Sequence, residues 1–225
     1  MVRKILSIAL LLPLTVWAQT RVLFIGNSYT GANNLAAMVQ DVAASAGHNL
    51  SATALTPGGA TLAGHAQNNA TYNAMGSQSW DFVVFQAQSQ EPSFPWGQVS
   101  TQTLPYAERL VDSARSIVPC AQPVFFRTWG RKNGDQGNCA AFPPLCTYEG
   151  MDSLLHRRYR MMADSNDAYL SPVGSVWHYL RDTDSTLELY APDGSHPSLA
   201  GSYAAACTFF TMFTGSDPTS IAFDA

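Results

Sequence analysis

Short apolar runs alternate with longer stretches of helical spacing along most of this chain. Five apolar runs, several of them bounded by glycine or proline, have the length and composition of strands: Val22–Ile25, Leu50–Leu55, Phe82–Phe85, Val124–Phe126 and Ala168–Val173. Five stretches carry the spacing of helices: Leu35–Ala46, Leu62–Ala74, Thr103–Val118, Gly150–Ser165 and Ser198–Met212. This alternation predicts an α/β fold in which helices cover both faces of a five-stranded parallel sheet.

Polar stretches follow the predicted strands at the points where those strands end. They contain Ser28, the pair Gly58–Gly59, the stretch Gln86 to Gln90 and the stretch Thr128 to Gly130, and a loop from Asp193 to His196 precedes the last helix. In a parallel sheet, the carboxyl ends of the strands lie at one edge, where ligands bind. We therefore expect these stretches, which are far apart in the sequence, to form one site.

The first residues of the chain have the pattern of an export signal. Arg3 and Lys4 precede the apolar run Ile5–Val16, and Val16 and Ala18 are small residues at the positions that a signal peptidase reads. The run is shorter than the roughly 20 residues that a membrane-spanning helix needs. We predict a signal peptide at residues 1–18, a single domain at residues 19–225 and a periplasmic or secreted protein. An uncleaved anchor is the alternative.

The charge balance narrows the class of ligand. Loss of Arg3 and Lys4 with the signal leaves 10 of the 12 basic residues against 16 acidic ones, a net charge of about −6 with neutral histidines. An acidic surface disfavours nucleic acid and anionic membranes as partners. The low charged fraction of 12% and the many hydroxyl, amide and aromatic side chains favour a neutral, hydroxyl-rich ligand.

The four cysteines match no metal-binding spacing, and export would place them where disulfides persist. Cys139 and Cys146 flank a proline-rich loop, and we predict a local bridge between them. Cys120 and Cys207 then remain. They either pair with each other or leave Cys207 as a small buried thiol in the last predicted helix.

The segment from Arg131 to Gly150 follows the fourth predicted strand and is too long for an ordinary connection. Long loops of this kind are usually functional or disordered, and a bridge within the loop would restrict its motion. We predict a disulfide-stapled flap that forms one wall of the cleft, with Phe142 or Trp129 facing the substrate.

Three side chains supply the groups of a hydrolytic site. Ser28 follows the apolar run Val22–Ile25, and Asp193 lies three residues before His196. A serine hydroxyl becomes a useful nucleophile when a neighbouring base takes its proton, and a carboxylate orients that base. Taken singly, these residues suit a helix cap, a turn and the start of a helix. Their expected convergence at one edge of the sheet favours catalysis.

These stretches resemble the conserved blocks of the SGNH (GDSL-like) hydrolase superfamily. Phe24–Ser28 is similar to the first block and Asp193–Pro197 to the last, Asp-x-x-His. Three intervening stretches resemble a subfamily of exported bacterial proteins with a glutamine-rich third block: Thr56–Leu62, Val83–Gln90 and Arg127–Gly130. The resemblance covers nearly all of residues 19–225. It implies a flavodoxin-like three-layer sandwich, ester hydrolysis and no metal or organic cofactor.

The resemblance also implies an oxyanion hole. In the superfamily, the donors are the backbone N–H of the nucleophile, the N–H of a second-block glycine and the side-chain amide of a third-block asparagine. Here the first donor is Ser28 and the second is Gly59, with Gly58 as the neighbouring candidate; a tight turn that needs positive φ explains either glycine as well. The asparagine is absent, and Gln88 or Gln90 stands in its place.

Together these patterns predict an exported serine hydrolase that cleaves esters of a small molecule or a polysaccharide, short acetyl esters of carbohydrates above all. Ser28, His196 and Asp193 form its expected triad. Tyr29 and Trp129 are expected to line the substrate cleft, where aromatic faces stack on sugar rings. Two alternatives stay open: a carbohydrate-binding protein without catalysis on the same scaffold, and a lipid- or thioester-cleaving esterase with a wider apolar cleft.

Overall fold

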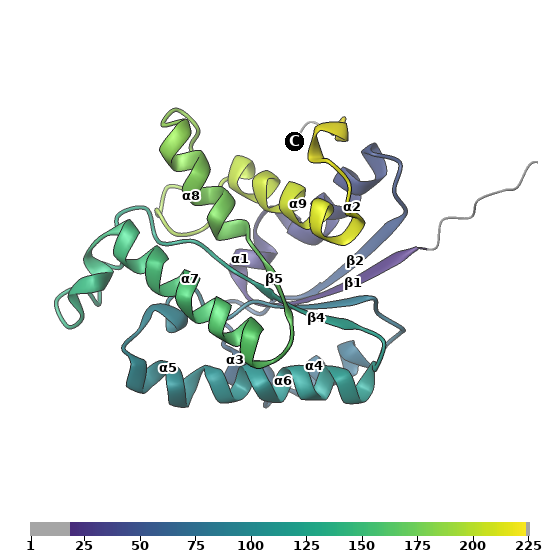
Figure 1. Cartoon of the computed structure of the whole chain (residues 1–225), viewed down its shortest axis with the longest axis horizontal. Coiled ribbons are helices and arrows are strands. Elements are labelled where there is room, and N and C mark those ends of the chain that lie inside the picture. The colour runs from purple at the N-terminus through teal and green to yellow at the C-terminus, as the bar shows by residue number, and fades with distance from the viewer. Residues whose placement is uncertain (1–18, 224–225) are drawn as a thin grey trace, which may run out of the picture.

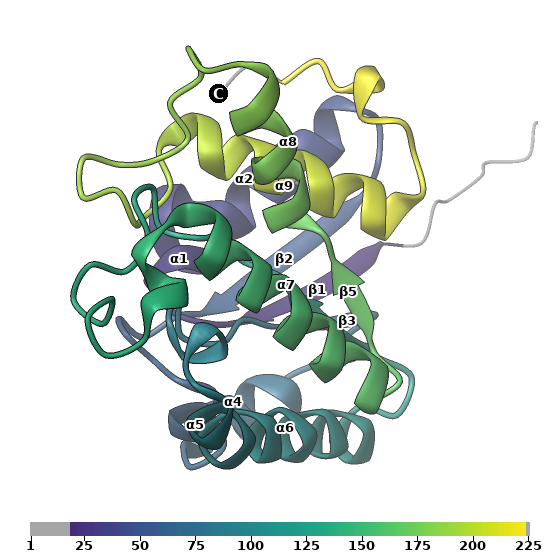
Figure 2. The ribbon, with the colours of Figure 1, turned by 60° about the vertical axis from the view of Figure 1, so that its left-hand side comes forward.

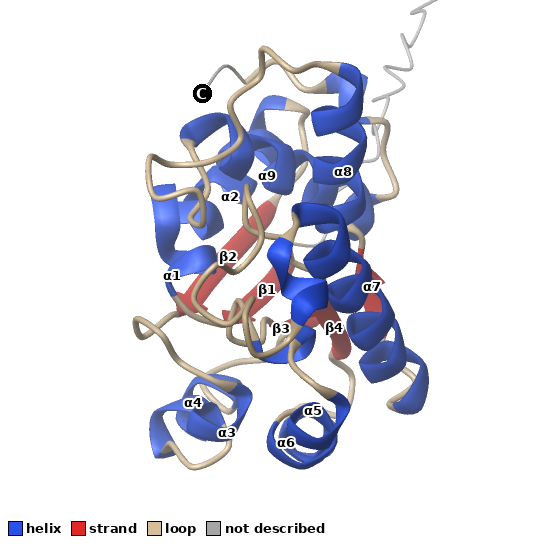
Figure 3. Cartoon of the chain, turned by 90° about the vertical axis from the view of Figure 1, so that its left-hand side faces the viewer, coloured by secondary structure: helices blue, strands red, loops and turns tan. Residues whose placement is uncertain are grey.

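The computed structural model of the chain describes residues 19–223, so the predicted signal peptide at residues 1–18 lies outside the described part. Within that part, a central sheet is covered by helices on both faces (Figure 1). Figure 3 shows the strands between two helical layers, with α2, α8 and α9 on one side and α3 to α6 on the other. The predicted three-layer α/β sandwich is confirmed.

The sheet has five parallel strands in the order β2-β1-β3-β4-β5. Their bounds are β1 Thr20–Ile25, β2 Leu50–Leu55, β3 Phe82–Phe85, β4 Gln122–Phe126 and β5 Tyr169–Ser171. The register pairs Ile25 with Leu55 on one side and with Phe85 on the other. The neighbouring strands β2, β1 and β3 therefore end level, and the loops that follow them start from one edge of the sheet.

Nine α-helices are present in residues 19–223: α1 Ser28–Gly31, α2 Leu35–Ser45, α3 Leu62–His65, α4 Asn69–Met75, α5 Trp96–Gln102, α6 Leu104–Ile117, α7 Tyr148–Ser165, α8 Val173–Thr183 and α9 Leu199–Thr214. Turned by 60°, the molecule shows α2, α8 and α9 packed above the sheet and α6 below it (Figure 2). None of the helices in this part of the chain is both long and apolar enough to span a membrane.

The core is divided by the sheet into two clusters. Along β1, Val22 and Phe24 point to the cluster beneath α2, α8 and α9, whereas Leu23 and Ile25 point to the cluster beneath α3, α4, α6 and α7. All four side chains are fully buried. A strand that is buried on both faces appears as a continuous apolar run rather than an alternating one, which is why the run Val22–Ile25 predicted a strand correctly.

Most of the other predicted boundaries differ from the structure by one or two residues, and two larger differences have a clear local cause. The predicted helix Leu62–Ala74 is two helices, because Asn68 caps a new one by accepting a hydrogen bond from the N–H of Ala70 at 2.9 Å. The predicted strand Ala168–Val173 ends at Ser171. Pro172, which has no N–H to donate to a sheet, precedes α8, a helix that the sequence analysis missed.

Candidate active site

A tight turn at Gly26 and Asn27 joins β1 to Ser28, and it leaves room for no side chain at Gly26. A Cβ there would lie 2.6 Å from Thr30 Oγ1 and 2.7 Å from Gln86 Oε1. Asn27 caps the following helix, since its Oδ1 accepts from the N–H of Tyr29 at 3.0 Å. Ser28 is therefore the first residue of α1, where backbone N–H groups have no intrahelical partner.

Two buried residues that sequence reasoning did not assign hold this turn in place. Gln86 Oε1 accepts from the N–H of Asn27 at 2.9 Å and from Thr30 Oγ1 at 2.8 Å. His65, the last residue of α3, is buried, and its Nε2 lies 2.8 Å from the carbonyl oxygen of Gly26. Because a carbonyl only accepts, Nε2 carries the proton, and burial lowers the pKa of His65 and keeps the ring neutral.

The structure brings together the three residues of the expected triad, Ser28, His196 and Asp193. Ser28 Oγ lies 2.8 Å from His196 Nε2, and His196 Nδ1 lies 2.5 Å from Asp193 Oδ2. The carboxylate accepts a hydrogen bond from the N–H at Nδ1, so Nε2 carries no proton and can accept a hydrogen bond from the serine hydroxyl. The side chains of His196 and Asp193 are 39% and 49% exposed, which leaves the site open to solvent.

Asp193 is oriented by its own loop. Its Oδ1 accepts from the backbone N–H groups of Ser195 and His196, each at 2.9 Å. Partial burial alone would raise the pKa of the Asp193 carboxyl, but the hydrogen bonds from the His196 side chain and from these two N–H groups outweigh it and lower the pKa. The group is thus a carboxylate that accepts at both oxygens.

The second block forms a turn beside Ser28. Gly59 adopts a φ of +68°, which favours glycine, and the N–H of Ala60 donates to the carbonyl of Pro57 at 3.1 Å. Asn27 Nδ2 donates to the carbonyl of Ala60 at 3.1 Å, which ties this turn to the residue before the nucleophile. The turn that the sequence left as an alternative for Gly59 is present, next to the proposed oxyanion position.

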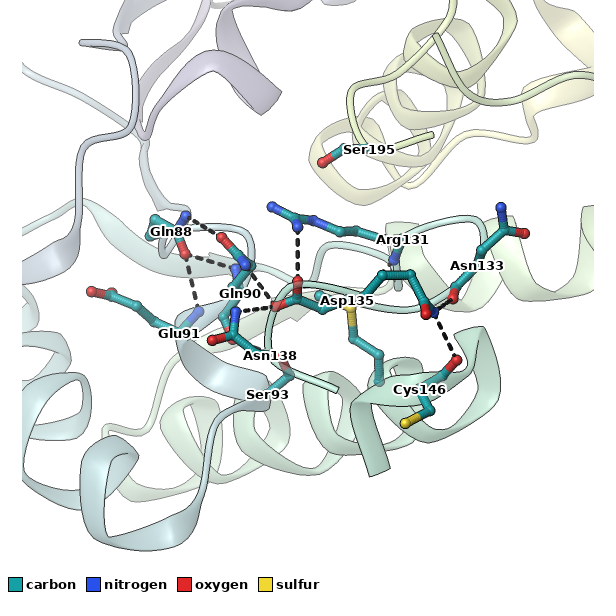
Figure 4. A network of polar contacts seen from close by, with 12 residues as sticks. Gln88, Gln90, Glu91, Ser93, Arg131, Asn133, Asp135, Asn138, Cys146 and Ser195 are labelled. Carbon is teal, nitrogen blue, oxygen red and sulfur yellow. Dashed lines mark hydrogen bonds and ion pairs between the residues drawn. The ribbon is translucent and has the colours of Figure 1, made fainter. Parts of the chain in front are cut away.

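The third block separates the two glutamines that the sequence analysis could not distinguish. Gln88 Oε1 accepts from the N–H groups of Gln90 and Glu91 at 2.7 and 3.1 Å, and Gln88 Nε2 donates to Gln90 Oε1 at 3.3 Å. Gln90 Nε2 donates to the carboxylate of Asp135 at 2.6 Å (Figure 4). Gln90 is therefore committed to the 131–146 loop, and Gln88 is the better candidate for an oxyanion donor.

Comparison with solved structures finds matches over most of the chain. A candidate SGNH hydrolase from Slackia heliotrinireducens is 29% identical over 86% of this chain and 98% of its own, with a TM-score of 0.68. The protein belongs to the SGNH hydrolase superfamily. A DUF4886 family protein from Bacteroides uniformis has a TM-score of 0.75 at 18% identity, with 92% of this chain and 88% of the other covered.

A third solved structure that matches the present chain is a mutant form of an acetyl-xylooligosaccharide esterase from a Geobacillus species. It has a TM-score of 0.56 at 15% identity and covers 88% of this chain and 95% of its own, a likeness of fold. No family model matches the sequence, and no curated protein matches it significantly. In residues 19–223, no group of three or more His, Cys, Asp or Glu side chains could hold a metal ion.

The two aromatic residues expected to line the cleft of the SGNH hydrolase are buried instead. Tyr29 and Trp129 are 2% and 1% exposed, and their rings stack on each other with centroids 5.0 Å apart. The other face of Trp129 stacks on Trp177 at 3.7 Å. The prediction that these faces meet a sugar is wrong, because other rings already cover them. Both residues bind Ser195: Tyr29 OH lies 2.6 Å from its Oγ, and Trp129 Nε1 donates to its carbonyl at 3.1 Å.

The predicted disulfide is present, and the loop that contains it lies at the active edge. Cys139 is bonded to Cys146, while Cys120 and Cys207 are free thiols. The N–H of Lys132 donates to the carbonyl of Gly194 at 2.8 Å, and a cavity of about 230 Å³ lies between residues 131–137 and 193–195. Phe142 does not face this cavity; it packs against the core cluster beneath α7.

Glu91, next to the third block, is expected to destabilise the SGNH hydrolase as the pH rises. Burial raises the pKa of its carboxyl from 4.5 to about 7, and its Oε2 has no hydrogen-bond partner in residues 19–223. A group whose pKa is raised by folding favours the folded state below its unfolded pKa, and this contribution is lost as the pH rises through 7. We predict that Glu91→Gln raises Tm at about pH 8 and leaves it nearly unchanged at about pH 4.

The measurement is Tm against pH for the wild type, for Glu91→Gln and for Glu108→Gln, an exposed residue of α6. The Glu108 variant should follow the wild type at every pH. Equal shifts in Tm for Glu91→Gln at acid and alkaline pH would contradict a titration effect.

Proposed function

We propose that this SGNH hydrolase is an exported serine esterase that removes short acyl groups, acetyl above all, from carbohydrates. The observation that carries the proposal is the continuous hydrogen-bonded chain from Ser28 Oγ through His196 to Asp193, with bonds of 2.8 and 2.5 Å. Serine, histidine and aspartate in this order perform acyl transfer on several unrelated folds. The family to which the chain belongs supports the same chemistry.

The reaction follows from the atoms in place. Ser28 Oγ attacks the acyl carbonyl while His196 Nε2 takes the hydroxyl proton, and Asp193 stabilises the imidazolium that forms. His196 then gives the proton to the leaving alcohol, and the acyl group stays on Ser28. Water, deprotonated by His196, attacks the acyl-enzyme. The carboxylic acid leaves and Ser28 regains its proton.

Three donors are proposed for the oxyanion of the tetrahedral intermediate. The N–H of Ser28 is at the first position of the one-turn helix α1, where it has no intrahelical partner. The N–H of Gly59 lies in the turn tied to Asn27, and Gln88 Nε2 replaces the asparagine amide of the superfamily. Preorganised donors of this kind act most strongly where charge develops in the transition state.

The proposed substrate class rests on the surroundings of the site. Polar side chains stand beside the third block, with Gln88, Gln90 and the Arg131–Asp135 ion pair in one group (Figure 4). A long alkyl chain laid against the partly exposed side chains of Gln88, Gln90 and Arg131 would take them out of water without offering them hydrogen bonds. The Geobacillus neighbour, an esterase of acetylated xylo-oligosaccharides, supports an acetyl ester, and the disulfide supports an oxidising compartment.

Hydrolysis of p-nitrophenyl acetate, butyrate, octanoate and palmitate tests this proposal. We expect kcat/KM to be highest for acetate and to fall by about tenfold or more by octanoate, a difference of roughly 1.4 kcal/mol in transition-state binding. The enzyme should also release acetate from acetylated xylo-oligosaccharides. A preference for palmitate would favour a lipid esterase, and binding of xylo-oligosaccharides without turnover of any ester would favour the non-catalytic alternative.

A further inference from the structure

Asp135 is an almost fully buried carboxylate in the 131–146 loop, a few residues before the Cys139–Cys146 disulfide, and it accepts hydrogen bonds from three donors. Its Oδ2 accepts from Gln90 Nε2 at 2.6 Å and from Asn138 Nδ2 at 2.7 Å. Its Oδ1 accepts from Arg131 Nη1 at 3.0 Å, and its side chain is only 1% exposed. Figure 4 shows these side chains converging on Asp135 from the loop and from the third block.

One of these contacts decides how the third-block amides are turned. A glutamine side chain can present either its oxygen or its nitrogen, and a carboxylate paired with a guanidinium only accepts. Gln90 therefore presents Nε2 to Asp135, which turns Gln90 Oε1 toward Gln88. Gln88 Nε2 meets that oxygen at 3.3 Å. The chain of contacts from Asp135 to Gln88 is consistent in its donors and acceptors at each step.

The opposite side of the Gln88 amide is fixed as well. Its Oε1 accepts from two backbone N–H groups, those of Gln90 and Glu91. With the oxygen held by the backbone and one amide hydrogen held by Gln90, the second hydrogen on Nε2 remains for a ligand. An oxyanion donor needs a hydrogen that is not already held by the protein.

We propose that Asp135 is a positioning residue that acts through Gln90 to orient Gln88 as the third oxyanion donor. The inference rests on the proposed function, because it assumes that Gln88 binds the oxyanion. It gives the 131–146 loop a role in the reaction that differs from a wall of the cleft. Glutamine has one more methylene and one more rotatable bond than the asparagine of the superfamily, so it needs more support to hold one geometry.

The expected effect of Asp135→Asn follows from the donor pattern. An asparagine side chain can offer its own N–H to Gln90, which would then turn its oxygen toward that N–H and its nitrogen toward Gln88. Two N–H groups would face each other, and Gln88 would leave its position. We expect kcat for p-nitrophenyl acetate to fall by about tenfold or more with little change in KM, against roughly 10²–10³ for Gln88→Ala.

A double-mutant cycle separates positioning from general support of the fold. If Asp135 acts through Gln88, Asp135→Asn lowers kcat in the wild type and has no further effect in the Gln88→Ala background. An equal loss in both backgrounds would overturn the proposal, and so would full activity of the single variant Asp135→Asn. Asp112→Asn, at an exposed carboxylate of α6, should keep the wild-type kcat.

Two other results, failure of Asp135→Asn to fold and full activity of Gln88→Ala, also have a defined meaning. If Asp135→Asn does not fold, Gln90→Met takes its place in the cycle: it keeps the Arg131–Asp135 pair, removes the amide that links Asp135 to Gln88, and should show the same loss and the same non-additivity. If Gln88→Ala itself keeps full kcat, the oxyanion role of Gln88 fails, and the positioning role fails with it. The triad proposal would stand in that case, because it depends on Ser28 and not on Gln88.

Discussion

Ser28→Ala is expected to lower kcat for p-nitrophenyl acetate by roughly 10⁶-fold, to the residual rate that binding and the oxyanion donors supply alone. The hydroxyl at this position lies 2.8 Å from His196 Nε2, and alanine leaves the base with nothing to deprotonate. The fold should survive, because the turn around Ser28 is held by Asn27 and Gln86 rather than by the serine hydroxyl. Steady-state kinetics and circular dichroism measure the two quantities.

A matched serine provides the control for this experiment. Ser185 is exposed in the turn after α8, and Ser185→Ala should keep the wild-type kcat. Reaction with a fluorophosphonate followed by peptide mass spectrometry should place the adduct on Ser28 in the wild type and give no adduct in Ser28→Ala. Retention of more than about a tenth of the activity in Ser28→Ala would point to another nucleophile and end the triad proposal.

The central strands of the sheet could be predicted well because they are buried on both faces, and Phe82–Phe85 matches β3 residue for residue. Leu50–Leu55 also matches β2 residue for residue, although only Leu50 of this edge strand is buried. The helix Val173–Thr183 was missed for a related reason: its first apolar residue continues the run that contains β5. Pro172, which marks the boundary, also suits the end of a strand.

Some residues of the candidate site could be predicted from the sequence and others could not. Ser28, Asp193 and His196 could be found because each lies in a short local pattern, and the parallel topology explains why distant patterns meet. Asp135 could not be found, since it lies 45 positions from Gln90 in a loop without periodicity, and only the folded chain makes them partners. Aromatic residues at the right edge were assigned to the cleft, yet stacking among Tyr29, Trp129 and Trp177 hides their faces.

Asp193→Asn is expected to lower kcat by roughly 10⁴-fold while the geometry of the site is kept. The carboxylate now accepts from His196 Nδ1 at 2.5 Å and holds the proton on that nitrogen. An asparagine can turn its N–H toward Nδ1, because its oxygen can still accept from the backbone N–H groups of Ser195 and His196 that Asp193 Oδ1 serves. The proton would then move to Nε2, and a protonated Nε2 cannot take the proton of Ser28.

If Asp193→Asn acts by changing the tautomer of His196, it should lower kcat without changing KM, and it should change how the activity depends on pH. KM for p-nitrophenyl acetate should change little, because Asp193 lies behind His196 and contacts no part of the ester in the proposed reaction. Asp184→Asn, at an exposed carboxylate after α8, is the matched control and should keep the wild-type kcat. Strong alkali supplies hydroxide that can replace the missing base, so the activity of Asp193→Asn should rise with pH well beyond the point where the wild type levels off. If Asp193→Asn lowers kcat by less than about tenfold, Asp193 neither orients His196 nor stabilises its imidazolium form. The third member of the triad would then have to be another residue.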